Sequence, residues 1–206
     1  MDMHPSIRAI LFDADGVILH PHRFRAWLER EHAITPAMTA PFFNGVFSRQ
    51  CLVGQVGLAD ALAPYLPGWG WQGTVEAFIA AWLEVENAPD ERMLAAVGSL
   101  RRAGYTVCLA TSQEANRAAY MRSVMGFERL FDRLFISCEL GCQKPEPDYF
   151  RRVEAELGLR GAPLLFWDDN PGWVAAARAC GWQAEVFGGV EAFERRMAGY
   201  LSHDLP

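Results

Sequence analysis

Short apolar runs alternate with amphipathic stretches along most of the chain. The first run, residues 7–12, is mostly apolar and stops at Asp13, as in a buried strand that ends in a polar turn. Further strands are expected at residues 105–110, 134–136, 163–167 and 183–187. Helical periodicity predicts helices at residues 91–103, 114–125, 147–157, 173–180 and 190–201. This alternation predicts an α/β fold, a Rossmann-like parallel sheet with helices on both faces.

One long segment, residues 21–88, departs from this alternation. It shows no clear strand, and its helical pieces are rich in aromatic residues. A connection of that length without structure of its own is uncommon in a compact domain. We therefore predict a small α-helical cap at residues 21–88, inserted into a core formed by residues 1–20 and 89–206. Most of the aromatic side chains should form the core of the cap, whereas Glu84 and Glu86 should lie on a solvent-exposed helix face.

Composition narrows the class of protein. Of the 206 residues, 51% are hydrophobic and 21% are charged, which is typical of a folded globular chain. The net charge of −6 argues against a nucleic-acid-binding protein. The sequence contains no apolar stretch of the roughly 20 residues needed to cross a bilayer, and no signal-peptide pattern. Five scattered cysteines suggest neither a zinc site nor a disulfide framework. We expect a cytoplasmic monomer or homodimer that acts on a small molecule.

Polar side chains follow four of the predicted strands, and in a parallel sheet the carboxyl ends of the strands meet at one edge. These residues are Asp13 and Asp15, Thr111 and Ser112, Lys144, and Asp168 and Asp169. Any one of them could simply cap a helix or form a turn. Together they make an oxygen-rich site suited to Mg²⁺, with a cation and hydroxyls for an anionic substrate. Lys144 is the single lysine beside eighteen arginines. The set favours phosphoryl transfer.

Four segments resemble motifs of the haloacid dehalogenase-like (HAD) hydrolases. Residues 11–19 contain Asp13-Ala14-Asp15-Gly16, which is similar to the DxDG first motif of that family. Residues 107–112 resemble the second motif, residues 140–150 the lysine motif, and residues 165–170 an acidic fourth motif of the Asp-Asp form. The predicted cap lies where one subgroup of the family carries a helical insertion. The resemblance covers nearly the whole chain.

The resemblance implies a role for each matching residue. Asp13 would be the nucleophile, and Asp15 the general acid and base. Thr111 and Lys144 would bind the phosphoryl group, with Ser112 as a further contact. The implied ligands of Mg²⁺ are the carboxylates of Asp13 and Asp169 and the backbone carbonyl of Asp15, with Asp168 as a ligand or as a partner of one. Many relatives carry a second acid at the position of Trp173, and often an asparagine at that of Ser112.

These roles imply a Mg²⁺-dependent phosphatase that hydrolyses a small phosphorylated metabolite through an aspartyl-phosphate, a sugar phosphate being one candidate. Three alternatives stay open: a phosphomutase, a dehalogenase-like hydrolase acting on carbon, and a binding relative without turnover. Dehalogenase members lack an aspartate at the position of Asp15, so its presence favours the phosphatase. In the cap, His22 and Arg23 are candidates for contact with the substrate.

Overall fold

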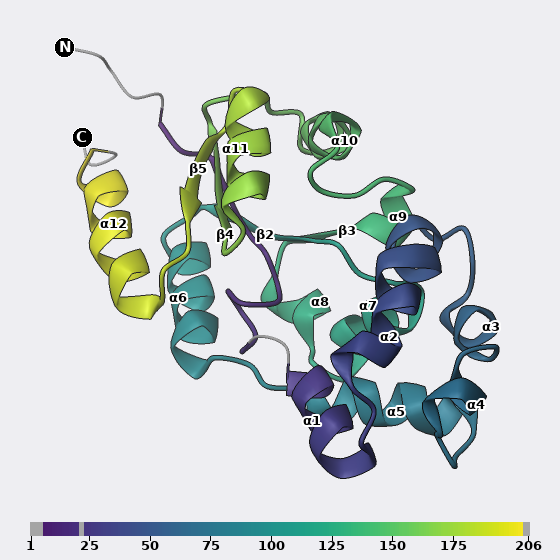
Figure 1. Cartoon of the computed structure of the whole chain (residues 1–206). Coiled ribbons are helices and arrows are strands. Elements are labelled where there is room, and N and C mark those ends of the chain that lie inside the picture. Colours follow the sequence, from purple (N-terminus) through teal and green to yellow (C-terminus); the bar gives the residue numbers. More distant parts are fainter. Residues whose placement is uncertain (1–5, 21–22, 204–206) are drawn as a thin grey trace.

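The computed structural model of the protein describes residues 6–20 and 23–203. At its centre lies a parallel five-stranded sheet with the order β3-β2-β1-β4-β5. The strands are β1 (Ala9–Phe12), β2 (Thr106–Thr111), β3 (Arg133–Ile136), β4 (Leu164–Asp168) and β5 (Gln183–Val186). Helices cover both faces of the sheet (Figure 1), so the predicted Rossmann-like α/β fold is confirmed.

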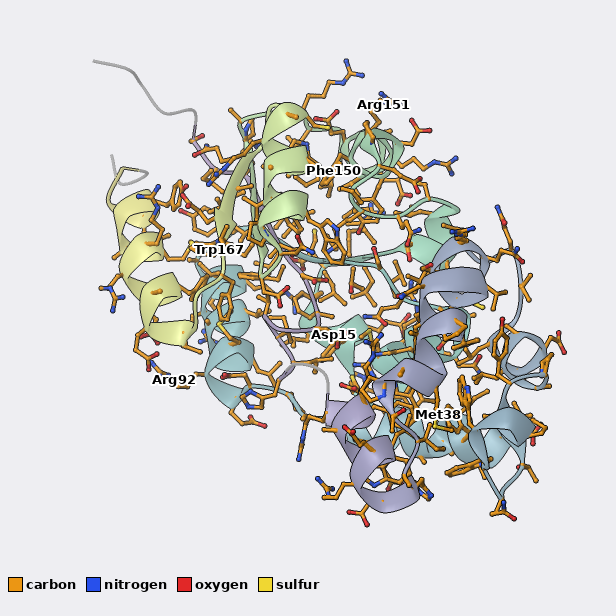
Figure 2. The ribbon with its side chains drawn as sticks, viewed as in Figure 1. Asp15, Met38, Arg92, Phe150, Arg151 and Trp167 are labelled. Atoms are coloured by element: carbon orange, nitrogen blue, oxygen red, sulfur yellow. The ribbon has the colours of Figure 1, made fainter. Side chains whose placement is uncertain are left out.

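Each face of the sheet builds its own apolar cluster, because successive strand side chains point to opposite faces. Ile10 and Phe12 pack in the cluster under α6 (Glu91–Arg102) and α12 (Val190–His203). Ala9 and Leu11 pack in the other cluster, under α10 (Pro147–Leu157) and α11 (Pro171–Ala179). In Figure 2, the labelled Trp167 belongs to the first cluster and Phe150 to the second.

The register of the central strand decides which polar groups meet. The last residue of β1, Phe12, lies opposite Leu109 of β2 on one side and Trp167 of β4 on the other. Asp13 follows directly, and its backbone N–H donates to the carbonyl of Trp167 at 2.9 Å. The first acidic turn therefore lies between the carboxyl ends of the two neighbouring strands.

The connections beyond β2 contain one helix that periodicity predicts, α7 (Ala115–Ser123), and two short ones that it does not, α8 (Phe127–Leu130) and, beyond β3, α9 (Ser137–Leu140). A helix of four residues makes only about one turn, so it leaves no repeating apolar pattern in the sequence. The other core helices end within two residues of their predicted limits.

A second group of helices lies between β1 and α6. These are α1 (Arg23–His32), α2 (Pro36–Phe42), the kinked helical segment η1 (Phe43–Cys51), α3 (Leu58–Leu62), α4 (Leu66–Trp69) and α5 (Val75–Val85). They share an apolar cluster of their own, in which the ring of Phe24 stacks on Trp82 and meets Phe78 edge to face. Residues 21 and 22, where the cap is predicted to begin, lie outside the described residues.

Two findings bear on the expectations from composition. All five cysteines are free thiols. None of the helices in the described part of the chain combines the length and the apolar character that a membrane span requires.

Candidate functional site

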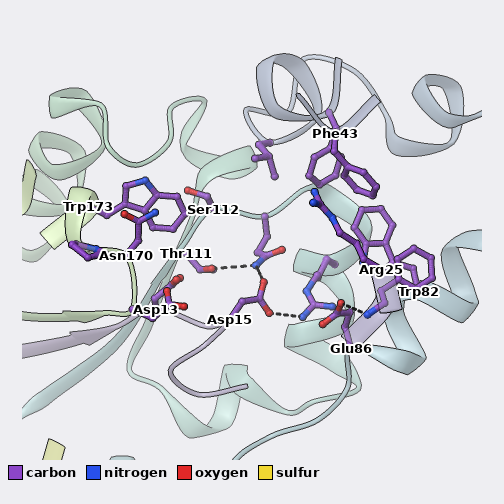
Figure 3. Close-up of a pocket in the computed structure, with 17 residues that line it drawn as sticks. Asp13, Asp15, Arg25, Phe43, Trp82, Glu86, Thr111, Ser112, Asn170 and Trp173 are labelled. Carbon is purple, nitrogen blue, oxygen red and sulfur yellow. Dashed lines mark hydrogen bonds and ion pairs between the residues drawn. The ribbon is translucent and has the colours of Figure 1, made fainter. Parts of the chain in front are cut away.

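The predicted site residues of the core meet at the carboxyl edge of the sheet. Asp13 follows β1, Thr111 ends β2 and Asp168 ends β4, whereas Lys144 comes from the loop between α9 and α10. All four side chains are buried, each with no more than 3% of its surface exposed. Figure 3 shows Asp13 and Thr111 beside one another at the floor of a cavity. Lys144 completes the group through its ion pairs.

The ammonium of Lys144 bridges two carboxylates. Its Nζ lies 2.9 Å from Oδ1 of Asp13 and 2.6 Å from Oδ2 of Asp168. The same Nζ lies 4.5 Å from the ring centroid of Trp173 and 5.1 Å from that of Phe166. Burial of a charged ammonium is costly unless such partners compensate it. The single lysine of the chain therefore sits where a compact cation joins two strand ends.

The surroundings of Asp13 disfavour the ionised form of its carboxyl group. Burial raises its pKa to about 6, against the attraction of Lys144, and repulsion from Asp168 and Asp15 acts in the same direction as burial. One ammonium is thus insufficient to stabilise all of the negative charge that gathers here. A bound divalent cation would favour the ionised form of Asp13.

Three carboxylates have the geometry of a metal site. Asp13, Asp168 and Asp169 each offer an oxygen within 4.8 Å of the other two. Both oxygens of Asp168 are engaged, since Oδ2 pairs with Lys144 and Oδ1 accepts the backbone N–H of Asn170 at 2.8 Å. Hard carboxylate oxygens of this kind fit Mg²⁺.

The turn after β1 approaches Asp169 closely at Gly16. That residue has φ of +80°, and a Cβ built on it would lie 2.2 Å from Oδ2 of Asp169. Any other residue would be strained by the backbone conformation and would displace the carboxylate. The glycine of the DxDG turn therefore leaves room for the acid at the end of β4.

Asp15 is held by two residues that the sequence analysis did not identify. Its Oδ2 accepts from Nε2 of Gln113 at 2.7 Å, and its Oδ1 pairs with Nη2 of Arg117 at 2.8 Å. Gln113 also donates to the hydroxyl of Thr111 at 3.3 Å. The carboxylate of Glu114 accepts the backbone N–H of Arg117 and so caps α7. Gln113 could have been predicted as a site residue, because it lies two positions after Thr111 in the sequence. No nearby sequence feature indicated that Arg117 contacts Asp15.

The site opens into a cavity of about 460 Å³ between the sheet edge and the second group of helices. From the core, the lining includes Asp13, Asp15, Thr111, Ser112, Gln113, Arg117, Asp169, Asn170, Pro171 and Trp173. From the other side it includes Phe24, Arg25, Phe43, Phe47, Leu52, Trp82 and Glu86. Figure 3 shows Trp173 and Asn170 at one end, and Phe43, Trp82 and Glu86 at the other.

The side opposite the sheet is lined partly by residues that the sequence did not indicate. Arg23 is exposed and is not among the lining residues, whereas Arg25 lines the cavity, with its guanidinium 4.8 Å from the ring centroid of Phe43. His22 lies outside the described residues. Glu86, which we expected to be exposed, is 5% exposed and lines the cavity, while Glu84 is exposed. Glu86 follows the last residue of α5, where the chain turns back toward the core.

Among the described residues, Ser112, Thr111 and Asp13 stand together at the cavity floor. The hydroxyl of Ser112 is buried and lacks a hydrogen-bond partner within the described structure. A buried hydroxyl without a hydrogen-bond partner is costly unless a ligand or a water molecule forms that bond. The arrangement thus offers a carboxylate, a cation and two hydroxyls, of which that of Ser112 is unpartnered, and this suits an anionic group.

Comparison with known proteins agrees with this geometry. The family model described as haloacid dehalogenase-like hydrolase matches residues 7–181. The structure of a HAD family enzyme from Bacteroides thetaiotaomicron superposes with a TM-score of 0.80 at 20% identity, covering 94% of this chain and 99% of that one.

Two curated relatives match in sequence. A sesquiterpene phosphatase from Aspergillus oryzae is 30% identical over 93 residues, which are 45% of this chain and 47% of the relative. The bifunctional epoxide hydrolase 2 of Sus scrofa is 23% identical over 188 residues, which are 80% of this chain and 33% of the relative. The chain thus matches less than half the length of each. With the family model spanning most of the sequence, the chain belongs to the haloacid dehalogenase-like hydrolases.

Proposed function

We propose that this protein is a Mg²⁺-dependent phosphatase that hydrolyses a small phosphorylated metabolite through an aspartyl-phosphate on Asp13. The observation that carries the proposal is the different setting of the two first-motif carboxylates. Asp13 is buried against Lys144 and the acidic group, and Asp15 is held at the cavity by Arg117 and Gln113. Two carboxylates with separate environments suit a nucleophile and a proton carrier.

The proposed reaction has two displacements. A carboxylate oxygen of Asp13 attacks phosphorus, the bond from phosphorus to the leaving oxygen breaks, and Asp15 gives that oxygen a proton. Water then attacks the phosphoryl group on Asp13, Asp15 takes up the proton of the water, and phosphate leaves as the Asp13 carboxylate reforms. Gln113 and Arg117 both donate to Asp15 and so fix the position of its carboxyl group for both proton transfers.

Other residues would bind the charge that the phosphoryl group carries. Thr111 and Ser112 would donate to its oxygens, and Lys144 would balance its charge while pairing with Asp13. Mg²⁺ would be held by the carboxylates of Asp13 and Asp169 and the backbone carbonyl of Asp15. It would supply charge neutralisation at the phosphoryl oxygens. Asp168, with both oxygens engaged, would act by fixing Lys144.

Similarity to known proteins also supports the proposal. The enzyme from Bacteroides thetaiotaomicron was crystallised with magnesium and inorganic phosphate, and that structure superposes with a TM-score of 0.77. One sequence relative is a phosphatase by name. We also propose that residues 21–88 act as a cap over a core of residues 1–20 and 89–206, since α1, η1 and α5 contribute to one wall of the cavity.

The test is release of p-nitrophenol from p-nitrophenyl phosphate, with Mg²⁺ and with EDTA. We expect release that requires Mg²⁺ and falls at least about 1000-fold in Asp13→Asn, because the nucleophile is lost. Glu29→Gln, a change at an exposed carboxylate of α1, serves as the control and should retain activity. Activity of Asp13→Asn comparable to the wild type would exclude Asp13 as the nucleophile. Halide release without phosphate release would indicate a carbon-centred hydrolase instead.

The role of Asp15 is tested with leaving groups of different basicity. Asp15→Asn should slow hydrolysis of an alkyl phosphate far more than that of p-nitrophenyl phosphate, because p-nitrophenolate hardly needs a proton to leave. Equal losses on both substrates would contradict a role in protonation.

A further inference from the structure

The cavity holds two charged groups whose hydrogen-bonding capacity is incompletely used. Glu86 is 5% exposed; its Oε1 accepts the backbone N–H of Phe24 at 2.8 Å, but its Oε2 has no partner in the described structure. Arg117 is 3% exposed; its Nη2 pairs with Asp15, but its Nε and Nη1 have no partner there. Both residues line the cavity. One unpaired acceptor and two unpaired donors therefore belong to residues that line the same cavity.

Groups of this kind are costly to leave unpaired in a buried place, and the cost is larger for charged groups. A carboxylate oxygen requires a donor, and a guanidinium N–H requires an acceptor. A hydroxyl group supplies both at once. A purely apolar ligand would leave the Oε2 of Glu86 and the Nε and Nη1 of Arg117 unpaired.

The walls around this pair are aromatic. Trp82 stacks on Phe24 with 5.2 Å between ring centroids and lies edge to face with Phe43 at 5.5 Å. Phe47 completes the group at 5.4 Å from Trp82. Aromatic walls with a few fixed polar groups suit a ligand that has an apolar C–H face and hydroxyls at its edge.

The position of Arg117 relates the pair to the reaction. Its guanidinium contacts Asp15, the residue that we propose protonates the ester oxygen. A hydroxyl that binds Arg117 would therefore lie close to that oxygen, on the leaving group. An isoprenoid chain, as a phosphatase of sesquiterpene esters would accept, would fit the aromatic walls but would carry no hydroxyl there.

From this juxtaposition we infer that Glu86 and Arg117 together bind a hydroxyl of the leaving group, so that the substrate is a polyol or sugar monophosphate. The inference rests on the proposed phosphatase function and deepens it. Glu86, just after the end of α5, would accept a hydrogen bond from this hydroxyl and so select for hydroxylated substrates. Arg117 would donate to the hydroxyl while it pairs with Asp15.

The inference is tested by a ratio of kcat/KM values for two matched esters, glycerol 1-phosphate and n-propyl phosphate. The wild type should prefer the hydroxylated ester about tenfold or more, because one satisfied polar contact distinguishes the two. Glu86→Gln keeps an oxygen for the N–H of Phe24 but presents an amide NH₂ in place of Oε2, so the ratio should fall toward one. Glu84→Gln, at the exposed carboxylate two residues earlier, should leave the ratio unchanged.

A second variant removes the other half of the pair. Arg117→Lys should slow the hydrolysis of both esters, because Asp15 loses its guanidinium partner. It should also lower the ratio of kcat/KM values for the two esters. A wild-type ratio near one, a ratio that Glu86→Gln leaves intact, or a preference for farnesyl phosphate over both esters would overturn the inference while p-nitrophenyl phosphate is still hydrolysed. Absence of phosphate release from every ester, p-nitrophenyl phosphate included, would overturn the proposed function itself.

Discussion

Replacing Asp13 with asparagine should stabilise the metal-free protein at alkaline pH, even though it removes the proposed nucleophile. The side chain is 3% exposed, and burial raises its pKa to about 6 from the ordinary 3.8. A carboxyl whose pKa is higher in the folded state binds protons more strongly there than in the unfolded chain. The free energy of unfolding therefore decreases as the pH rises through this range. Asparagine has no such titration, while Lys144 keeps Asp168 as a partner.

The size of the effect follows from the two pKa values. Linkage gives an ionisation penalty of about 3 kcal/mol at pH 8 and about half as much at pH 5 for a group shifted from 3.8 to about 6. Contributions of the amide that do not depend on pH cancel between the two conditions. The stability of Asp13→Asn relative to the wild type should therefore rise by about 1 kcal/mol from pH 5 to pH 8.

Urea denaturation in EDTA, followed by the fluorescence of the seven tryptophans, measures this difference at both pH values. Glu29→Gln makes the same chemical change at an exposed position, and it should shift stability by less than about 0.5 kcal/mol at either pH. A difference between Asp13→Asn and the wild type that stays constant, or shrinks, from pH 5 to pH 8 would refute the electrostatic reasoning.

Further predictions concern the metal, the glycine turn and the aromatic cluster. Mg²⁺ should raise the melting temperature of the wild type, and Asp169→Asn should lose most of that rise; an undiminished rise would exclude Asp169 as a ligand. Gly16→Ala should abolish the Mg²⁺-induced rise, since its Cβ would meet Asp169. Gly70→Ala, at φ of +77° with open space around it, is the control for backbone strain and should retain the rise. Phe78→Ala should lower the free energy of unfolding by about 3–5 kcal/mol in urea titrations, because the ring is fully buried; a loss below about 1 kcal/mol would contradict its place in the cluster.

The sequence by itself determined the sheet and the core half of the candidate site. Strand positions follow from local apolar runs, and parallel strands place their carboxyl ends at one edge whatever the connections do. Asp13, Thr111, Lys144 and Asp168 could therefore be assigned to one site before any coordinates were known. A single lysine among many arginines pointed to the residue that joins two strand ends.

The tertiary structure alone decided which residues of the second group of helices line the cavity, and what surrounds Asp15. On a helix, two positions two residues apart point about 200° from each other, so only the docking of α1 determines that Arg25 and not Arg23 lines the cavity. Arg117 reaches Asp15 across 102 residues of sequence, and Glu86 accepts from Phe24 across 62. Such contacts depend on how separate elements pack, and the local apolar pattern does not carry that information.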